Sequence, residues 1–351
     1  MTPPSTSATL AADVVRWQRA QGRHGLPWQG TRNPYRVWLS EIMLQQTQVS
    51  TVLDYYPRFL ARFPDVQSLA AASQDEVLGL WAGLGYYSRA RHLHRCAQAV
   101  VADHGGVFPA TAAQLQTLPG IGRSTAAAIA AFCHGERAAI LDGNVKRVLG
   151  RALAFGEDLA VPRHERALWS LAQDLLPPAE DMPAYTQGLM DLGATVCVRR
   201  SPRCGLCPLA ARCVALAQGQ PEAYPVIQRK LRRGQRQNTL LWISQGERVW
   251  VVPRADTGIW AGLWSWPEYE DEAQARQDCA GWPGQWTALP AFTHVLTHLD
   301  WTLTPLHLAL PPGAEAAAWP ADRWPQGRWL APAQWADWGL PAPLRRLLGL
   351  A

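Results

Sequence analysis

The sequence lacks any apolar run of the roughly 20 residues that a membrane-spanning helix requires. Its N-terminal stretch, MTPPSTSATL, has neither the basic head nor the apolar run of a secretion signal. It also contains no internal repeat. We therefore expect a globular cytosolic protein that makes no use of a membrane. With 351 residues and 48% hydrophobic content, the chain is long enough for about two domains.

The net charge of +5 is distributed unevenly along the chain. Residues 1–236 contain 26 Lys or Arg and 17 Asp or Glu, a balance of +9, whereas residues 237–351 contain 7 and 11, a balance of −4. Tryptophan divides in the same way, since 13 of the 18 lie after residue 240. The asymmetry indicates two units, of which the basic one is the candidate for a polyanionic partner. An ordinary soluble surface explains the charge equally well.

The spacing of apolar residues changes near the middle of the chain. Up to residue 217 they recur at helical spacing with Gly and Pro between segments, which predicts eight or more helices and almost no strand in a domain 1–217. Residues 218–237 are polar and basic and are predicted to form a linker. In 238–351, alternation at 239–244, 248–254 and 292–310 predicts strands, and a short helix is expected at 343–350. We expect a mainly α region followed by an α+β domain.

Cysteine is concentrated in one short segment. Four of the seven follow the spacing Cys-x6-Cys-x2-Cys-x5-Cys, at Cys197, Cys204, Cys207 and Cys213. Without a secretion signal, this pattern favours metal ligation over disulfides. Four thiolates suit either a structural zinc ion or an iron-sulfur cluster. The remaining cysteines are expected to fill cores: Cys96, Cys133 and Cys279.

Residues 111–133 predict a helix, a tight turn and a second helix. The turn is Pro119-Gly120-Ile121-Gly122, in which Gly120 and Gly122 permit positive φ and a close backbone approach. The amides that open the second helix could then bind a phosphate oxygen. Asp142 follows Gly120 by 22 residues, and by itself it would be an ordinary N-cap of a helix beginning near Val145.

The order of hairpin, aspartate and four-cysteine loop resembles the helix-hairpin-helix glycosylase superfamily, which includes endonuclease III. The resemblance implies a 4Fe-4S cluster on the four cysteines and a chemical role for Asp142. Lyase members carry a nucleophilic lysine in the second helix of the hairpin, where this chain has Ser124. Because serine cannot form a Schiff base, a monofunctional glycosylase is implied. Lys146 is the nearest candidate for residual lyase chemistry.

The segment Ser40-Glu41-Ile42-Met43-Leu44-Gln45-Gln46-Thr47-Gln48-Val49 is similar to the signature of MutY-type adenine glycosylases, whose glutamate is the catalytic acid. Adenine is a poor leaving anion, so its N7 must be protonated as the bond breaks. A carboxyl in apolar surroundings could hold that proton near neutrality, which suits Glu41. The positive sugar left behind calls for a second carboxylate, which suits Asp142. An isolated helical glutamate would ordinarily be a surface residue.

Such an enzyme must extrude adenine from the base stack. Gln46 and Tyr86 match family positions that insert into the duplex or contact the lesion strand, although Tyr86 would also suit core packing. Positions that match the adenine pocket are Leu26, Trp28 and Gln187, of which Gln187 could hydrogen-bond to the base edge. Arg199 and Arg200 lie in a cysteine loop without acidic residues, so they are candidates for phosphate contacts.

Residues 254–264, RADTGIWAGLW, resemble the MutT-like recognition domain of the same family. A Nudix hydrolase needs a glutamate-rich helix for Mg²⁺, but residues 274–282 offer only Asp278, so we do not expect nucleotide hydrolysis. The family's Phe-Ser-His lesion-recognition turn aligns with residues 296–298, where Leu296 lacks the ring and Thr297 keeps the hydroxyl. Thr297, His298 and His294 are candidate contacts, with ordinary strand histidines as the alternative.

Taken together, the resemblance implies a MutY-type glycosylase that excises adenine opposite 8-oxoguanine or guanine in double-stranded DNA. We expect a monomer in the bacterial cytoplasm, associated with the nucleoid. Two alternatives remain: an endonuclease III-like glycosylase and AP lyase, and a non-enzymatic DNA-binding module with a metal loop.

Overall fold

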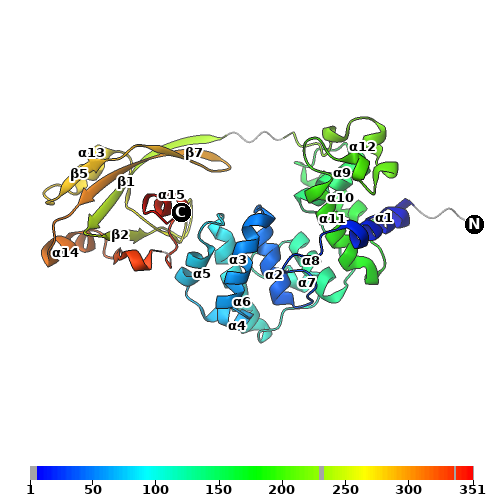
Figure 1. Cartoon of the computed structure of the whole chain (residues 1–351), viewed down its shortest axis with the longest axis horizontal. Coiled ribbons are helices and arrows are strands. Elements are labelled where there is room, and N and C mark those ends of the chain that lie inside the picture. The colour runs from blue at the N-terminus through cyan, green and yellow to red at the C-terminus, as the bar shows by residue number, and fades with distance from the viewer. Residues whose placement is uncertain (1–5, 229–232, 336, 351) are drawn as a thin grey trace, which may run out of the picture. The chain divides into compact units, whose positions relative to one another are not determined.

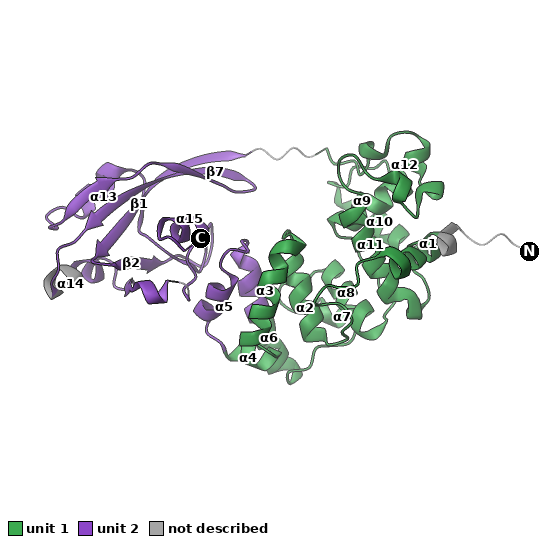
Figure 2. Cartoon of the chain, in the orientation of Figure 1, with its two compact units in different colours: residues 1–71, 95–229 green, residues 72–94, 230–351 purple. Residues whose placement is uncertain are grey.

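The computed structural model describes residues 6–228, 233–335 and 337–350. The chain forms two compact units (Figures 1 and 2), which are described separately. Unit 1 comprises residues 1–71 and 95–229, and unit 2 comprises residues 72–94 and 230–351. Residues 229–232 of the predicted linker lie outside the described residues. Among the helices of the described ranges, none combines the length and the apolar character needed to cross a bilayer.

Unit 1 is helical, as predicted for this part of the chain. Its helices are α1 (Thr6–Gln21), α2 (Pro34–Leu44), α3 (Val49–Arg62), α4 (Val66–Ala71), the end of α6 (Tyr87–His104), α7 (Ala112–Leu115), α8 (Arg123–His134), α9 (Gly143–Ala152), α10 (Pro162–Asp174), α11 (Met182–Thr195) and α12 (Val214–Ala217). Short 3-10 turns lie at Ala179–Asp181, Cys204–Leu206, Ala210–Arg212 and Pro221–Ala223.

Local sequence determines where the helices around the site begin. Asn33 caps α2, because its side-chain oxygen accepts a hydrogen bond from the N–H of Arg36, and Pro34 occupies the first turn, where no backbone donor is needed. Helix α11 packs against α1, α8 and α9. Buried Val14, Val145 and Leu189 belong to the core that these helices share. This core fixes the positions of α9 and α11 relative to each other.

The predicted hairpin forms between α7 and α8. Gly120 adopts a φ of 76°, a conformation that favours glycine. Gly122 does not use this freedom: its φ is −81°, because it is the N-cap of α8 and takes the extended backbone of such residues. Ile121 is buried between them and anchors the turn. Both glycines are exposed, so the first amides of α8 are accessible.

Unit 2 contains, among its described residues, a mixed eight-stranded sheet with β3-β2-β1-β7-β5 as its main path. The strands are β1 (Gly234–Gln245), β2 (Arg248–Pro253), β3 (Trp264–Ser265), β4 (Glu268–Tyr269), β5 (Gln285–Ala288), β6 (Phe292–Val295), β7 (Leu299–Ala309) and β8 (Arg328–Leu330). The helices are α5 (Gln74–Trp81), the beginning of α6, α13 (Glu272–Asp278), α14 (Ala314–Arg323) and α15 (Ala342–Leu347), with a 3-10 turn at Pro332–Gln334.

Strand β1 is the centre of this sheet. It pairs antiparallel with β2, which confirms the predicted hairpin, and parallel with β7 along its whole length. It begins at Gly234, within the predicted linker 218–237, because pairing with Leu299 on β7 extends it. Tryptophans account for much of the packing: Trp242 stacks on Trp266 with 4.8 Å between ring centroids, and Trp260 lies 4.6 Å from Trp301.

The segment 72–94 joins the C-terminal part of the chain in unit 2, which the sequence did not predict. The indole nitrogen of Trp264 donates a hydrogen bond of 3.0 Å to Asp75 on α5. Arg91 on α6 donates to the carbonyl of Ala261. Part of the α-helical sequence therefore packs on the sheet domain rather than within unit 1.

Candidate functional site

A groove of about 1410 Å³ lies in unit 1, between α2, the start of α9 and α11. It gathers seven of the residues that the sequence predicts for the active site and base pocket: Leu26, Trp28, Glu41, Gln46, Ser124, Asp142 and Gln187. The groove therefore brings the two candidate carboxyl groups together, although they are far apart in the sequence.

Glu41 projects from α2 into the groove and retains only part of its surface. Its helix neighbours Ser40 and Ile42 are buried. Burial, together with a smaller effect of the negative charge of Asp142, raises the pKa of Glu41 to about 8. No described residue donates a hydrogen bond to this carboxyl group that would favour its ionised form. Glu41 therefore holds a proton at neutral pH, as a general acid must.

Asp142 is held by the start of α9. Its Oδ1 accepts a hydrogen bond of 2.8 Å from the N–H of Val145, so the predicted capping role is confirmed. A helix N-terminus favours a negative charge at this position. Ser124 on α8 adds a contact that sequence reasoning missed, since its Oγ accepts a 3.1 Å hydrogen bond from the N–H of Leu141. This bond fixes the backbone directly before Asp142.

Two predicted contacts near the groove have distinct environments. Trp28 is buried and packs edge-on against Tyr56, with ring centroids 5.4 Å apart. Gln46 is exposed just beyond the end of α2 and adopts a φ of 55°, which is uncommon for a residue with a side chain. The lining of the groove thus includes the buried indole ring of Trp28 and the exposed amide side chain of Gln46.

Lys146 is not among the residues that line the groove. Its Nζ is 2.6 Å from Glu165 on α10, in a partly exposed ion pair. The candidate for residual lyase chemistry is therefore engaged by a carboxylate in this structure.

Four further predicted residues belong to unit 2. The Tyr86 hydroxyl is 3.1 Å from the Thr297 hydroxyl, so the structure brings these two predicted lesion contacts together. Tyr86 is 46% exposed and has a φ of 49°, which rules out the alternative that it packs in the core. His298 is exposed beside Thr297. His294 lies against Trp260, 5.4 Å between ring centroids, and burial lowers its pKa.

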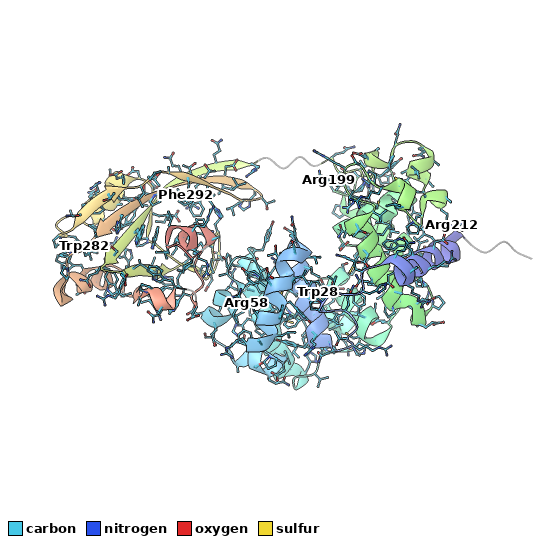
Figure 3. The ribbon with its side chains drawn as sticks, viewed as in Figure 1. Trp28, Arg58, Arg199, Arg212, Trp282 and Phe292 are labelled. Carbon is cyan, nitrogen blue, oxygen red and sulfur yellow. The ribbon has the colours of Figure 1, made fainter. Side chains whose placement is uncertain are left out.

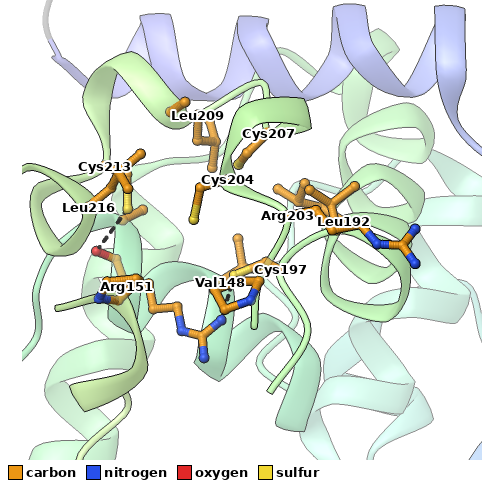
Figure 4. A pocket seen from close by; sticks show the side chains of 15 residues that line it. Val148, Arg151, Leu192, Cys197, Arg203, Cys204, Cys207, Leu209, Cys213 and Leu216 are labelled. Atoms are coloured by element: carbon orange, nitrogen blue, oxygen red, sulfur yellow. Dashed lines mark hydrogen bonds between the residues drawn. The ribbon is translucent and has the colours of Figure 1, made fainter. Parts of the chain in front are cut away.

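The four predicted ligands Cys197, Cys204, Cys207 and Cys213 line one small cavity in unit 1, together with apolar side chains from α9, α11 and the loop (Figure 4). Burial raises the pKa of Cys207 to about 11 and raises that of Cys213. All four cysteines are half-buried, and thiolates withdrawn from water in this way need a cationic partner. The donor set therefore fits a 4Fe-4S cluster, which these four thiolates would hold and which would fix the loop.

Two arginines on α9 hold this loop, and sequence reasoning missed both. Arg151 is buried and donates hydrogen bonds to the Cys197 Sγ at 3.4 Å and to the Val198 carbonyl at 2.7 Å. Arg147 donates to the Cys197 carbonyl at 2.7 Å. Their spacing of four residues on a helix beside a cysteine loop is the signal that could have identified them.

The arginines of the loop differ in their availability. Arg212 donates a 2.7 Å hydrogen bond to Asp13 on α1, whereas Arg199 and Arg200 are exposed and form no ion pair with any described residue. Figure 3 shows Arg199 and Arg212 on different sides of unit 1. Arg199 and Arg200 therefore remain free for an anionic partner.

Three family models match successive parts of the chain. Residues 39–174 match the HhH-GPD superfamily of base excision DNA repair proteins, residues 197–213 the iron-sulfur binding domain of endonuclease III, and residues 238–350 the NUDIX domain. A thermostable thymine-DNA glycosylase is similar in structure over 60% of this chain and 97% of its own, with a TM-score of 0.53 and 27% identity. A non-covalent endonuclease III-DNA complex shares the fold, with a TM-score of 0.50 and 20% identity over 60% of this chain and 94% of its own.

The fold, the groove and the cysteine loop define a helix-hairpin-helix DNA glycosylase with a 4Fe-4S cluster and a C-terminal Nudix-like domain. The adenine DNA glycosylase of Buchnera aphidicola subsp. Schizaphis graminum is 31% identical over 95% of this chain and 96% of its own length. That of Mus musculus is 35% identical over 89% and 73%. This chain belongs to the adenine DNA glycosylase family and acts in DNA repair by excising adenine.

Proposed function

We propose that this chain removes adenine mispaired with 8-oxoguanine, and more slowly with guanine, from duplex DNA, using Glu41 as acid and Asp142 as cation stabiliser. The observation that carries the proposal is the shared groove, in which Glu41 has a pKa of about 8 beside a carboxylate that caps a helix. In a bacterial cell such an enzyme would act on the nucleoid.

The chemistry follows from the two environments. Adenine is flipped into the groove, and Glu41 donates its proton to N7 as the bond between N9 and C1′ breaks. The electron pair of that bond leaves with the base, and the sugar becomes an oxocarbenium-like cation. Asp142 stabilises this cation until water adds to C1′. The proton released by the water restores Glu41, so the acid is ready for another cycle.

The same geometry supports a reaction that stops at base release. The Ser124 hydroxyl is engaged with the backbone N–H of Leu141, and Lys146 is paired with Glu165. An amine must reach C1′ to form the Schiff base from which strand cleavage proceeds. Neither side chain offers a free amine to the groove, so we expect a monofunctional enzyme.

Recognition of the opposite base is assigned to unit 2. Tyr86 and Thr297 present their hydroxyl groups together, and both side chains are exposed. Two adjacent hydroxyls can donate or accept hydrogen bonds at the edge of an oxidised guanine. The ring that the family places before this hydroxyl is absent at Leu296. We therefore expect a preference for 8-oxoguanine that depends on Tyr86 and Thr297.

The decisive measurement is free adenine released from duplexes that pair adenine with 8-oxoguanine, guanine, cytosine or thymine. We expect single-turnover release to be fastest opposite 8-oxoguanine and slower opposite guanine. Equal release opposite all four bases would contradict the assigned specificity. Strand cleavage without added base or heat would favour the endonuclease III-like alternative, and an absence of any base release would favour a DNA-binding module.

A further inference from the structure

A buried carboxylate that the mechanism does not use lies directly behind the groove. Asp191 on α11 is 0% exposed. Its oxygens accept hydrogen bonds from the backbone N–H of Arg23 at 2.9 Å, from the Arg23 Nε at 2.7 Å and from the amide Nε2 of Gln187 at 2.8 Å. Arg23 and Gln187 line the groove, whereas Asp191 does not. The carboxylate therefore acts on the groove through these two neighbours.

The contact with Asp191 fixes which end of the Gln187 amide is available. An ionised carboxylate accepts hydrogen bonds but cannot donate one, so only the NH₂ end of the amide can face it. The Arg23 guanidinium forms an ion pair with Asp191, and its closest nitrogen is 2.7 Å from the carboxylate. The carbonyl oxygen of Gln187 accepts no hydrogen bond from a described residue. It remains as an acceptor for a group bound in the groove.

Gln29 supplies a second side-chain amide to the lining of the groove, and here the oxygen rather than the NH₂ group is occupied. The Oε1 of Gln29 accepts a 3.1 Å hydrogen bond from the N–H of Leu26, so its oxygen is occupied. Its Nε2 is buried and has no hydrogen-bond partner among the described residues. A buried donor without a partner is costly, and a ligand that accepts its hydrogen bond would relieve that cost. The residues that line the groove thus supply one acceptor without a described partner and one buried donor without a described partner.

We propose that Asp191 is a positioning residue that sets the base specificity of the enzyme. It fixes the Gln187 amide so that the carbonyl accepts a hydrogen bond from the 6-amino group of adenine, and Gln29 donates to N1 of the ring. Hypoxanthine presents a carbonyl at position 6 and an N–H at position 1, so both hydrogen bonds would be mismatched. This inference rests on the proposed excision of adenine and adds the element that selects the base.

The test compares adenine with hypoxanthine in otherwise identical duplexes, both opposite 8-oxoguanine. In Asp191→Asn the new side chain can donate as well as accept, so the Gln187 amide is free to reverse. We expect the ratio of single-turnover rates, adenine over hypoxanthine, to fall by about 10- to 100-fold, the range for mispaired polar groups in a binding site. A ratio measured within one variant is unaffected by the amount of folded enzyme.

Two more variants separate specificity from stability. Gln187→Leu leaves the Arg23–Asp191 pair intact and should lower the rate ratio of adenine over unsubstituted purine by a similar factor. Thr186→Val is the matched control, because Thr186 is buried on the same helix, has no side-chain partner among the described residues and does not line the groove. It should keep both wild-type ratios.

The outcomes distinguish this inference from the proposed function. Wild-type ratios in both Asp191→Asn and Gln187→Leu would overturn the positioning role, whatever their absolute rates. A wild-type enzyme that releases no adenine would instead overturn the proposed function. Reduced ratios in both variants, with unchanged ratios in Thr186→Val, support the assignment.

Discussion

The raised pKa of Glu41 has a measurable cost in stability. Burial, aided by the charge of Asp142, raises the pKa from 4.5 to about 8 in the folded protein. Below pH 4.5 the carboxyl is protonated in both the folded and the unfolded states. Between pH 4.5 and 8 only the unfolded state releases the proton freely. The free energy of unfolding therefore falls as the pH rises through this window and levels off above pH 8.

The variant Glu41→Gln removes this dependence, because its side chain does not titrate. Each pKa unit corresponds to about 1.4 kcal/mol. Relative to wild type, the free energy of unfolding of the variant should therefore rise by about 3 kcal/mol between pH 4.5 and 7, and by about 5 kcal/mol by pH 9. The introduced amide is itself partly buried, at a cost of about 1 to 3 kcal/mol that is constant with pH. The slope against pH, rather than the absolute difference, is the diagnostic quantity.

Thermal unfolding of wild type and Glu41→Gln, measured in parallel from pH 5 to 9, would test this expectation. A gain of about 3 kcal/mol corresponds to a Tm increase of roughly 6 to 12 °C for a unit of this size. Loss of the cluster's absorbance would report on unit 1 in particular. Glu247→Gln, in an exposed turn, is the control and should show no such trend. A Tm difference independent of pH would refute the argument that the fold holds Glu41 protonated.

The remaining predictions concern catalysis and DNA binding. Glu41→Gln should still bind lesion duplex while releasing almost no adenine, and the wild-type single-turnover rate should fall as the pH rises through about 8; a flat profile would exclude Glu41 as the acid. Asp142→Asn should lower the rate at least about 100-fold with little change in Tm, because asparagine also caps a helix; an unchanged rate would reduce Asp142 to a cap. Arg199→Ala and Arg200→Ala should each lower the salt slope of DNA binding by about one, and unchanged slopes would place the phosphates elsewhere. Truncation near residue 230 should weaken the preference for 8-oxoguanine more than it weakens excision, and an equal preference would remove that role from the C-terminal domain.

Structural features that depend on a local pattern were predictable from the sequence. The cysteine spacing, the hairpin turn and the capping aspartate each occupy a short segment, and the structure confirms Asp142 as the cap and Gly120 at positive φ. Gly122 shows the limit of such reasoning, because two glycines in one turn need not share a conformation. Glycine permits positive φ, but Gly122 has a φ of −81° because it is the N-cap of α8.

Contacts between distant segments were not predictable. Nothing near Asp191 in the sequence indicates that Arg23 will reach it, since 168 positions separate them. The same holds for Ser124 and the backbone of Leu141, and for the segment 72–94, whose helices look like the rest of the α-helical region. These contacts depend on tertiary packing, which periodicity and composition do not encode.

The two carboxyl groups lie at opposite ends of their helices, and for Glu41 this position acts in the same direction as burial, the main cause of its raised pKa. Glu41 lies in the last turns of α2, where backbone N–H groups are already used within the helix and the dipole disfavours a negative charge. Asp142 precedes α9, where free N–H groups and the dipole favour one. Because one groove joins the end of one helix to the start of another, it can hold an acid and a carboxylate together at the same pH. The roles proposed for Glu41 and Asp142 thus agree both with the burial of Glu41 and with the positions of the two groups on their helices.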